Sequence, residues 1–306
     1  MTESLGKKRR LQQATTAHGT LAVLAIDHRG PLRRALARHP ADVEVDAAVS
    51  ELKVDIVRAL ADSSSAVLLD PETGLEPCVR HGALPGRTGL LVALDTGSTG
   101  DPTRLETSLV PDWDVARVVG TGAAGAKLLV YYHPDAPSAG AVERLVAAIG
   151  RDCAAHQLPF YLEPLSFNPR APGTPLTSAD RRHVVIEAAR RLCPLGVDVL
   201  KTEFPVAVKE TSEVAVWRDA CQELTAACAV PWVLLSAGVS YELFLQQATV
   251  SCEAGASGVM AGRAVWDQAV TLDRHARRDW LETVARERMQ RLAALADALG
   301  RPLAGL

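Results

Sequence analysis

Short apolar runs bounded by glycine, proline or polar residues recur along the chain, and they predict β-strands. The runs are nearly continuous in hydrophobicity rather than alternating between apolar and polar residues. Continuous runs are typical of strands that are covered on both faces, as in a parallel sheet. The sequence therefore predicts eight buried strands, at residues 21–27, 65–70, 89–94, 125–132, 159–165, 198–204, 231–238 and 258–263.

Segments in which apolar residues keep helical spacing lie between these runs, at residues 46–61, 112–119, 139–156, 178–191, 210–228 and 241–253. Eight strands alternating with helices predict an α/β fold, a (β/α)8 TIM barrel, whose typical size is about 250 residues. We therefore expect residues 1–306 to form a single barrel domain with two additions. These are an N-terminal segment, 1–19, and a long C-terminal helix at about 277–299.

Glycine and proline are frequent in two segments, 95–102 and 168–175, which predicts loops at both places. The segments follow the third and fifth predicted strands. A barrel would place them at its catalytic face, where they could serve as lids over the substrate.

Charge and composition exclude several classes of protein. The formal net charge is −3 and the only basic cluster is Lys7–Arg10, so we expect no nucleic-acid partner and no polybasic membrane surface. Polar residues follow that cluster, so we interpret it as a solvated helix face and not as part of a signal peptide. No apolar run is long enough to span a membrane. Six cysteines without metal-binding spacing indicate reduced thiols and a cytoplasmic protein.

Polar side chains interrupt the predicted strands, mostly near their carboxyl ends, where barrel enzymes carry their active sites. Charges inside strands are rarely buried without pairing or use, so we predict that these side chains converge. Single members have structural alternatives: Asp27 could cap a helix, Asp70 could begin an Asp-Pro turn, and Glu163 could only neutralise a lysine. The predicted set comprises Asp27, His28, Arg29, Asp70, Lys127, Glu163, Lys201, Glu203, Ser236 and Arg263.

Lys201 is the candidate nucleophile. It lies inside an apolar run, and Glu203 points to the same side of the strand because side chains alternate. A desolvated lysine beside a carboxylate is the smallest set of groups for imine chemistry, and a structural ion pair is the alternative. A charged Lys127 in the same core would favour the neutral form of Lys201, and Glu163 is the candidate for moving protons to and from the substrate.

The last two predicted strands end in Ser236-Ala-Gly238 and in Gly262-Arg263. Barrels often bind phosphate at these two places through backbone N–H groups and small residues, and Arg263 could add a bidentate contact. We therefore predict an anion site there. The alternative is that the glycines only form tight turns.

Seven motifs give the chain a resemblance to a known family of enzymes. They are AIDHRG (25–30), LLDPETGL (68–75), KLLVYY (127–132), LEPL (162–165), DVLKTEFP (198–205), LSAGVS (235–240) and GRAVW (262–266). Together they resemble the class I tagatose-1,6-bisphosphate aldolases, and also the sulfofructosephosphate aldolases of the same superfamily. The resemblance implies an enzyme without metal or cofactor that acts on a sugar phosphate, in which Lys201 forms the imine and Glu163 is the acid and base. It also implies that Lys127 and Asp27 bind substrate hydroxyls, and that Ser236, Gly262 and Arg263 hold an anionic group.

One position departs from the family pattern, which has glutamine where this chain has His28. A histidine there could donate a hydrogen bond to the substrate or change which sugar fits. Arg29 is expected to pair with a neighbouring acid. Three other functions stay open: a sulfofructosephosphate aldolase, a metal-dependent aldolase that uses His28 and His133, and a non-catalytic sugar-phosphate sensor. The C-terminal helix could cover the barrel or form the contact of a homo-oligomer.

Overall fold

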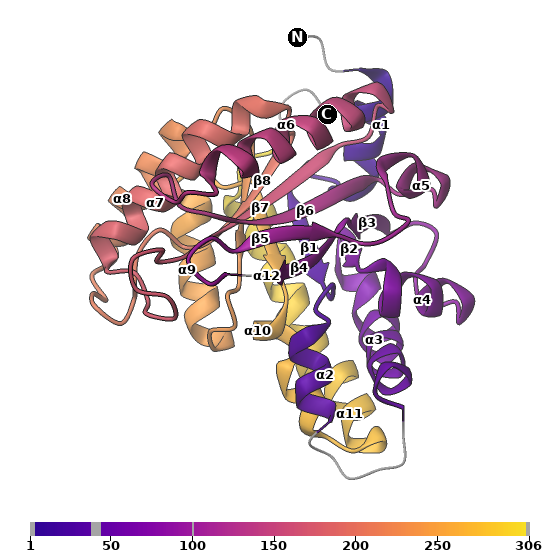
Figure 1. Cartoon of the computed structure of the whole chain (residues 1–306). Helices are drawn as coiled ribbons and strands as arrows, with labels where there is room; N and C mark the ends of the chain where they lie inside the picture. The colour runs from indigo at the N-terminus through magenta and orange to yellow at the C-terminus, as the bar shows by residue number, and fades with distance from the viewer. Residues whose placement is uncertain (1–3, 38–43, 100, 304–306) are drawn as a thin grey trace.

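The computed structural model describes residues 4–37, 44–99 and 101–303. Eight parallel strands close into a barrel in the order β1-β10-β9-β8-β7-β6-β3-β2, with helices around it (Figure 1). The predicted (β/α)8 barrel is therefore confirmed, and each strand overlaps one predicted run. The strands are β1 (Leu21–Ala25), β2 (Ala66–Leu69), β3 (Gly89–Ala93), β6 (Gly125–Tyr132), β7 (Phe160–Ser166), β8 (Val199–Thr202), β9 (Trp232–Leu235) and β10 (Gly258–Ala261).

Helices occupy all the predicted helical segments, with ends displaced by a few residues. They are α1 (Leu5–Ala14), α2 (Gly30–Leu36), α3 (Val45–Leu60), α4 (Glu76–Arg80), α5 (Val115–Gly120), α6 (Ala139–Ala155), α7 (Ser178–Leu192), α8 (Val214–Ala227), α9 (Tyr241–Glu253), α10 (Arg263–Trp266), α11 (Arg274–Trp280) and α12 (Arg286–Leu299). Side-chain caps fix several starts: Thr177 accepts from the N–H of Asp180, and Ser240 accepts from the N–H of Leu243. The short helices α2 and α4 were not predicted, because they carry too few turns for a periodic signal.

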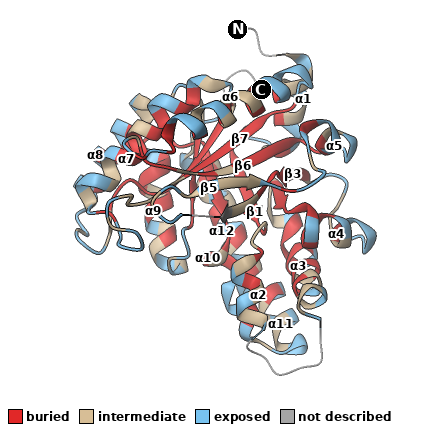
Figure 2. Cartoon of the chain, in the orientation of Figure 1, coloured by how far each residue is buried: buried red, intermediate tan, exposed pale blue. Residues whose placement is uncertain are grey.

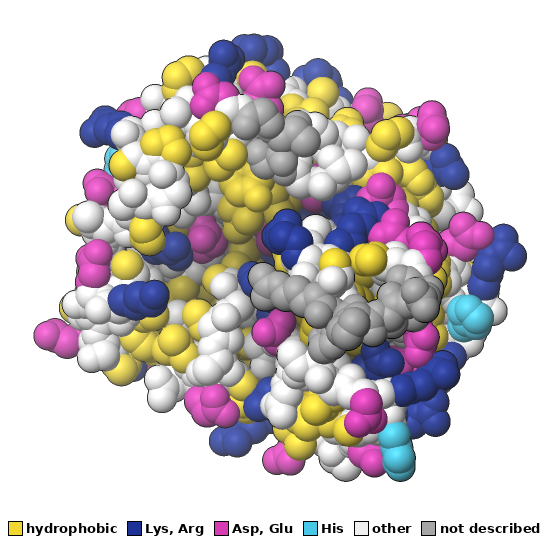
Figure 3. Space-filling view, turned by 60° about the horizontal axis from the view of Figure 1, so that its bottom comes forward, with side chains coloured by type: hydrophobic (Ala, Val, Ile, Leu, Met, Phe, Trp, Pro, Cys, Tyr) yellow, Lys and Arg dark blue, Asp and Glu magenta, His cyan; other side chains and the backbone are white. Residues whose placement is uncertain are grey.

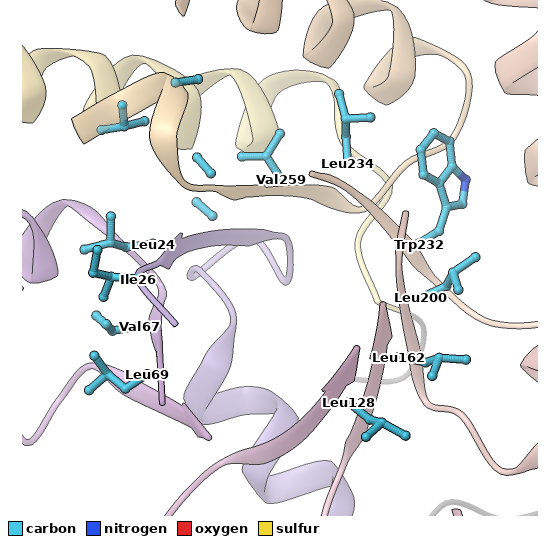
Figure 4. Packing of buried hydrophobic residues seen from close by; sticks show 14 of the residues in the cluster. Leu24, Ile26, Val67, Leu69, Leu128, Leu162, Leu200, Trp232, Leu234 and Val259 are labelled. Carbon is cyan, nitrogen blue, oxygen red and sulfur yellow. The ribbon is translucent and has the colours of Figure 1, made fainter. Parts of the chain in front are cut away.

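The barrel strands are buried on both faces (Figure 2). Side chains on one face, among them Leu24, Val67 and Leu162, pack in the cluster that the helices cover (Figure 4). Alternate residues form a second apolar cluster inside the barrel, which contains Leu21, Val23, Ala25, Leu68, Leu91, Ala93, Tyr161, Val199, Val233 and Met260. Because strand side chains alternate with a period of two, the next inward positions toward the carboxyl ends carry the polar residues of the site.

Helix α1 covers the amino-terminal end of the barrel. Leu11 and Ala14 belong to the inner apolar cluster. Nζ of Lys7 lies 2.6 Å from Oδ2 of Asp198, and Arg10 donates to the carbonyl of Gln157 at 2.7 Å. The prediction of a solvated basic face was therefore wrong for Lys7 and Arg10, which fasten the helix to the barrel.

The segment after β3 is not the loop that its glycines predicted. Residues Asp95–Thr99 form β4, which pairs antiparallel with β5 (Glu106–Leu109) in a separate two-stranded sheet. Threonine favours strands, but the half-exposed β5 has no apolar run that would have predicted a strand there. The second Gly/Pro-rich segment, 168–175, contains no helix or strand, as predicted.

The C-terminal helical segment is longer than predicted. It begins at Arg274, where Oδ1 of Asp273 accepts from the N–H groups of His275 and Ala276. It continues through a π-helical turn, η5 (Leu281–Ala285), into α12, which packs against α9, β1 and β10. The described helices include none that is long and apolar enough to cross a bilayer.

Candidate active site

A cavity of about 490 Å³ opens at the carboxyl ends of the barrel strands. All the predicted catalytic and substrate-binding residues line it: Asp27, His28, Lys127, Glu163, Lys201, Ser236, Gly238, Gly262 and Arg263. Figure 3, in which the lower side of Figure 1 has come forward, shows basic and acidic side chains close together around a recess near the middle of this face. The structure thus brings these nine residues together, and their contacts indicate what each can do.

A second hollow, of about 630 Å³, lies at the opposite end of the barrel beside α1. Its lining is mostly Ser, Thr and Gln, and its Arg87 is paired with Asp62 at 2.6 Å. It lacks the lysines and carboxylates that converge in the smaller cavity, so we place the active site at the carboxyl ends of the strands.

Lys127 lies at the centre of three carboxylates. Its Nζ is 2.7 Å from Oδ2 of Asp27, 2.8 Å from Oε2 of Glu163 and 3.1 Å from Oδ1 of Asp95. The side chain is fully buried. Burial by itself would lower the pKa of Lys127, but the three carboxylates outweigh it and raise the pKa well above the usual value. Three carboxylates thus surround the ammonium, and Lys127 stays charged.

Lys201 and Lys127 share one oxygen of Glu163. Nζ of Lys201 lies 2.8 Å from Oε2, the same atom that contacts Lys127. Burial would raise the pKa of the Glu163 carboxyl, but the two neighbouring ammonium groups lower it, so the group is ionised at neutral pH. The pKa of Asp27 is likewise well below its usual value, since the same two lysines outweigh its burial.

Asp95 is a member of this cluster that the sequence did not predict. Its carboxylate is buried and also accepts from the backbone N–H of Leu129 at 2.8 Å. It was assigned to a loop because it follows the apolar run 89–94. The alternation of strand side chains could have predicted it, since Leu91, Ala93 and Asp95 point to the same side of one extended segment.

His28 is neutral in this environment. Desolvation by burial lowers its pKa to about 4, although Asp27 opposes the shift. Its ring makes an edge contact with Trp266, with the ring centroids 5.2 Å apart. Nδ1 is buried without a hydrogen-bond partner and lies 3.8 Å from Oδ1 of Asp27. The imidazole therefore offers hydrogen-bonding groups to the cavity without adding charge.

The predicted anion site is compact. Oγ of Ser236 accepts from the N–H of Gly262 at 3.2 Å, which ties the end of β9 to the end of β10. Ala237 and Gly238 both have positive φ, 47° and 74°, so their backbone turns sharply at the cavity wall. A Cβ placed on Gly238 would lie 2.8 Å from Cζ of Arg263. Nε of Arg263 is buried without a partner, so the guanidinium keeps donors for a ligand.

The other polar residues of the predicted set behave differently. Arg29 pairs with Glu72 at 2.9 Å and with Asp95, as predicted. The prediction that Asp70 converges on the site was wrong: it forms a fully buried ion pair with Lys53 and does not line the cavity. Asp70 caps the turn after β2, because its carboxylate accepts from the N–H of Thr73 at 2.7 Å.

Glu203 does line the cavity, but its oxygens have partners in the protein. Oε2 accepts from the N–H and the hydroxyl of Ser166, both at 2.6 Å, and Oε1 lies 3.4 Å from Nη1 of Arg181. His133, the second histidine considered for a metal site, does not line the cavity and accepts from the N–H of Asp135. Within residues 4–37, 44–99 and 101–303, no group of three or more His, Cys, Asp or Glu side chains is arranged to hold a metal ion.

Comparisons with known proteins agree with this geometry. The model of the DeoC/LacD family of aldolases matches residues 21–268. A relative from Staphylococcus aureus (strain JH9), named tagatose 1,6-diphosphate aldolase, is 34% identical over 92% of this chain and 93% of its own. Among solved structures, a fructose-bisphosphate aldolase from Plasmodium falciparum superposes with a TM-score of 0.75 at 14% identity, over 97% of this chain and 95% of that one.

An archaeal fructose-1,6-bisphosphate aldolase, solved with its catalytic lysine covalently bound to the carbinolamine intermediate, has a TM-score of 0.61 and 20% identity, over 95% of this chain and 99% of that one. These structural likenesses establish the barrel, while the family match and the sequence relative establish kinship. The chain is therefore an aldolase that belongs to the DeoC/LacD family.

Proposed function

We propose that the chain is a class I aldolase that reversibly cleaves tagatose 1,6-bisphosphate to dihydroxyacetone phosphate and glyceraldehyde 3-phosphate. The observation that carries this proposal is the buried set formed by Lys201, Glu163 and Lys127, in which one lysine can attack a ketone while the other keeps the carboxylate charged. The printed name of the Staphylococcus aureus relative supports the choice of substrate.

The reaction begins when Lys201 passes a proton to Glu163 and its neutral amine attacks the C2 carbonyl of the ketose. Glu163 returns that proton to the carbinolamine hydroxyl, and loss of water gives an iminium ion, which withdraws electrons from the C3–C4 bond. Glu163 takes the proton of the C4 hydroxyl and the C3–C4 bond breaks, so that the aldehyde leaves. The electron pair of the broken bond moves into the iminium and forms an enamine. Protonation of the enamine at C3 and hydrolysis of the imine then release dihydroxyacetone phosphate and Lys201.

The contacts suggest which atoms face the substrate. Both lysines contact Oε2 of Glu163, which leaves Oε1 to exchange protons with the substrate. Three carboxylate oxygens lie within 3.1 Å of Nζ of Lys127, so a substrate hydroxyl would have to displace one of them to reach this lysine. We therefore assign Lys127 chiefly to holding Glu163 and Asp27, and assign substrate hydroxyls to Asp27 and His28.

The anionic group of the ketose end is assigned to the backbone around Ser236, Gly238 and Gly262, and to the guanidinium of Arg263. Small residues let the backbone approach a phosphate closely, and an arginine with unpaired donors can bind it in a bidentate manner.

Borohydride trapping tests the imine. The protein is reduced in the presence of dihydroxyacetone phosphate and its peptides are mass-mapped. We expect an adduct on Lys201 and none on Lys53, an equally buried lysine that is paired with a carboxylate and lies outside the cavity. Lys201→Ala should lose both the adduct and turnover while keeping its unfolding temperature. Detectable binding without any adduct on Lys201 would contradict the proposal.

Cleavage assays then identify the sugar. The panel is tagatose 1,6-bisphosphate, fructose 1,6-bisphosphate and 6-deoxy-6-sulfofructose 1-phosphate, since all three would give dihydroxyacetone phosphate. Preference for the sulfonate would move the assignment to a sulfofructosephosphate aldolase without altering the imine mechanism.

A further inference from the structure

Asp95 links the lysine cluster to charges outside the cavity. Its Oδ1 is 3.1 Å from Nζ of Lys127 and 2.8 Å from the backbone nitrogen of Leu129. Its Oδ2 is 3.4 Å from Nη2 of Arg29, which also donates to the Asp95 carbonyl. Nη1 of Arg29 contacts Glu72 at 2.9 Å. Charges therefore alternate in sign from Lys127 through Asp95 and Arg29 to Glu72.

The side chains in this series of charges differ in burial. The side chains of Asp95 and Arg29 are 4% and 7% exposed, whereas Glu72 is 37% exposed. An ion pair in water contributes little, while a desolvated charge depends strongly on its partner. Arg29 is therefore held mainly through Asp95, and Asp95 is held from both sides, by Arg29 and by the N–H of Leu129.

This arrangement fixes the direction of the Lys127 ammonium. Its Nζ donates hydrogen bonds to Asp27 and Asp95 and forms an ion pair with Glu163 at 2.8 Å, so the three carboxylates together hold it where it contacts both Glu163 and Asp27. Without the third carboxylate it could rotate away from either of the other two. We propose that Asp95, oriented by Arg29, is a positioning residue that keeps the Lys127 ammonium directed at Glu163 and Asp27. The inference rests on the proposed function, because it assigns a part in the same reaction.

If Asp95 has this role, neutralising it should change the pH dependence of the reaction. The charged and titratable groups around Lys127 come from five strands or their ends: Asp27, Arg29, Asp95, Tyr131, Glu163 and Lys201. Neutralising Asp95 removes one of the carboxylates that raise the pKa of Lys127, so that pKa falls. The less compensated ammonium also lowers the pKa of Glu163 further. Both limbs of the pH–rate profile should then move to lower pH.

The test compares Asp95→Asn with Glu72→Gln, because each removes one carboxylate that contacts Arg29, but only Asp95 touches Lys127. We expect D95N to lower kcat about tenfold, with KM within about threefold and both pH limbs displaced downward, and E72Q to stay within about twofold of the wild type. Arg29→Gln should lower kcat severalfold alone but add less than about twofold to D95N, because Arg29 acts through Asp95.

Two controls keep the outcomes separate. Borohydride trapping on the wild type tests the imine itself, so an adduct on Lys201 combined with a D95N pH profile that coincides with the wild-type profile would overturn only the role of Asp95. Thermal unfolding shows whether D95N is folded at the assay temperature. If it is not, R29Q carries the test, and a wild-type kcat in folded R29Q would overturn the proposal.

Discussion

Replacing Gly238 by alanine tests the anion site through two separable effects. The backbone of Gly238 has φ of 74°, a left-handed conformation that glycine adopts without strain and alanine does not. The added Cβ would also lie 2.8 Å from Cζ, 2.9 Å from Nη2 and 3.1 Å from Nη1 of Arg263. These distances are too short for a stable contact, so the guanidinium must leave its place.

The two effects have different magnitudes and different readouts. Left-handed strain costs about 1–2 kcal/mol of folding stability. Displacing Arg263 removes a charge-assisted hydrogen bond to the ligand, which contributes about 1.5–3 kcal/mol. Since 1.4 kcal/mol corresponds to a factor of ten, the dissociation constant for dihydroxyacetone phosphate should rise roughly 10- to 150-fold.

Gly173→Ala is the matched control. Gly173 has φ of 80°, and nothing lies within 4 Å of the position its Cβ would take. Urea unfolding should show a similar stability loss in both variants, while isothermal titration with dihydroxyacetone phosphate and with inorganic phosphate should show weaker binding only in Gly238→Ala. Equal affinities in the two variants would refute the assignment of the anion to Arg263.

Two further predictions concern buried titratable side chains. The unfolded chain protonates His28 near pH 6.5 but the folded protein only near pH 4, so protons favour the unfolded state and stability falls as pH drops between these values. His28→Gln should remove about 2–3 kcal/mol of this loss, measured by urea unfolding at pH 7 and pH 4, and an unchanged pH dependence would refute the burial argument. Lys53→Met leaves the Asp70 carboxylate buried without its ammonium and should destabilise the fold by about 3–5 kcal/mol. Most of that loss should be recovered in Lys53→Met/Asp70→Asn, and a double variant as unstable as the single one would contradict the mechanism.

The pattern of apolar residues predicted most of the architecture. It did not predict the segments whose structure depends on strand pairing rather than on burial. The barrel strands and the long helices are continuous or periodic apolar segments, so sequence alone located them. The hairpin β4–β5 buries little apolar surface, and its register depends on a partner strand that has no pattern of its own. Asp95 was missed for the same reason, since it begins that hairpin.

Asp70 shows the opposite error. Its position after a buried strand resembles that of Asp27, but Asp27 faces inward to Lys127 while Asp70 is held by Lys53 from α3. The partner Lys53 lies on the apolar stripe of α3, four residues from Val49 and from Val57, so the helical period places it on the buried side but does not show which carboxylate it meets. Strand parity would not have separated the two, because Leu68 faces inward and Leu69 outward, just as Ala25 and Ile26 do before Asp27. A period of two therefore places Asp70 inward, and it is the turn after β2 that directs it to Lys53 instead.

The position of α1 bears on how the enzyme can be handled. The helix begins at Leu5 and lies against the amino-terminal end of the barrel (Figure 1). The cavity opens at the other end, where the strands have their carboxyl ends. An affinity tag or a surface linker attached at this terminus should therefore leave the opening of the cavity accessible to solvent. Trimming through Leu11 would instead uncover the apolar interior and detach the Lys7 bridge to Asp198, so immobilised or fused forms should keep this helix whole.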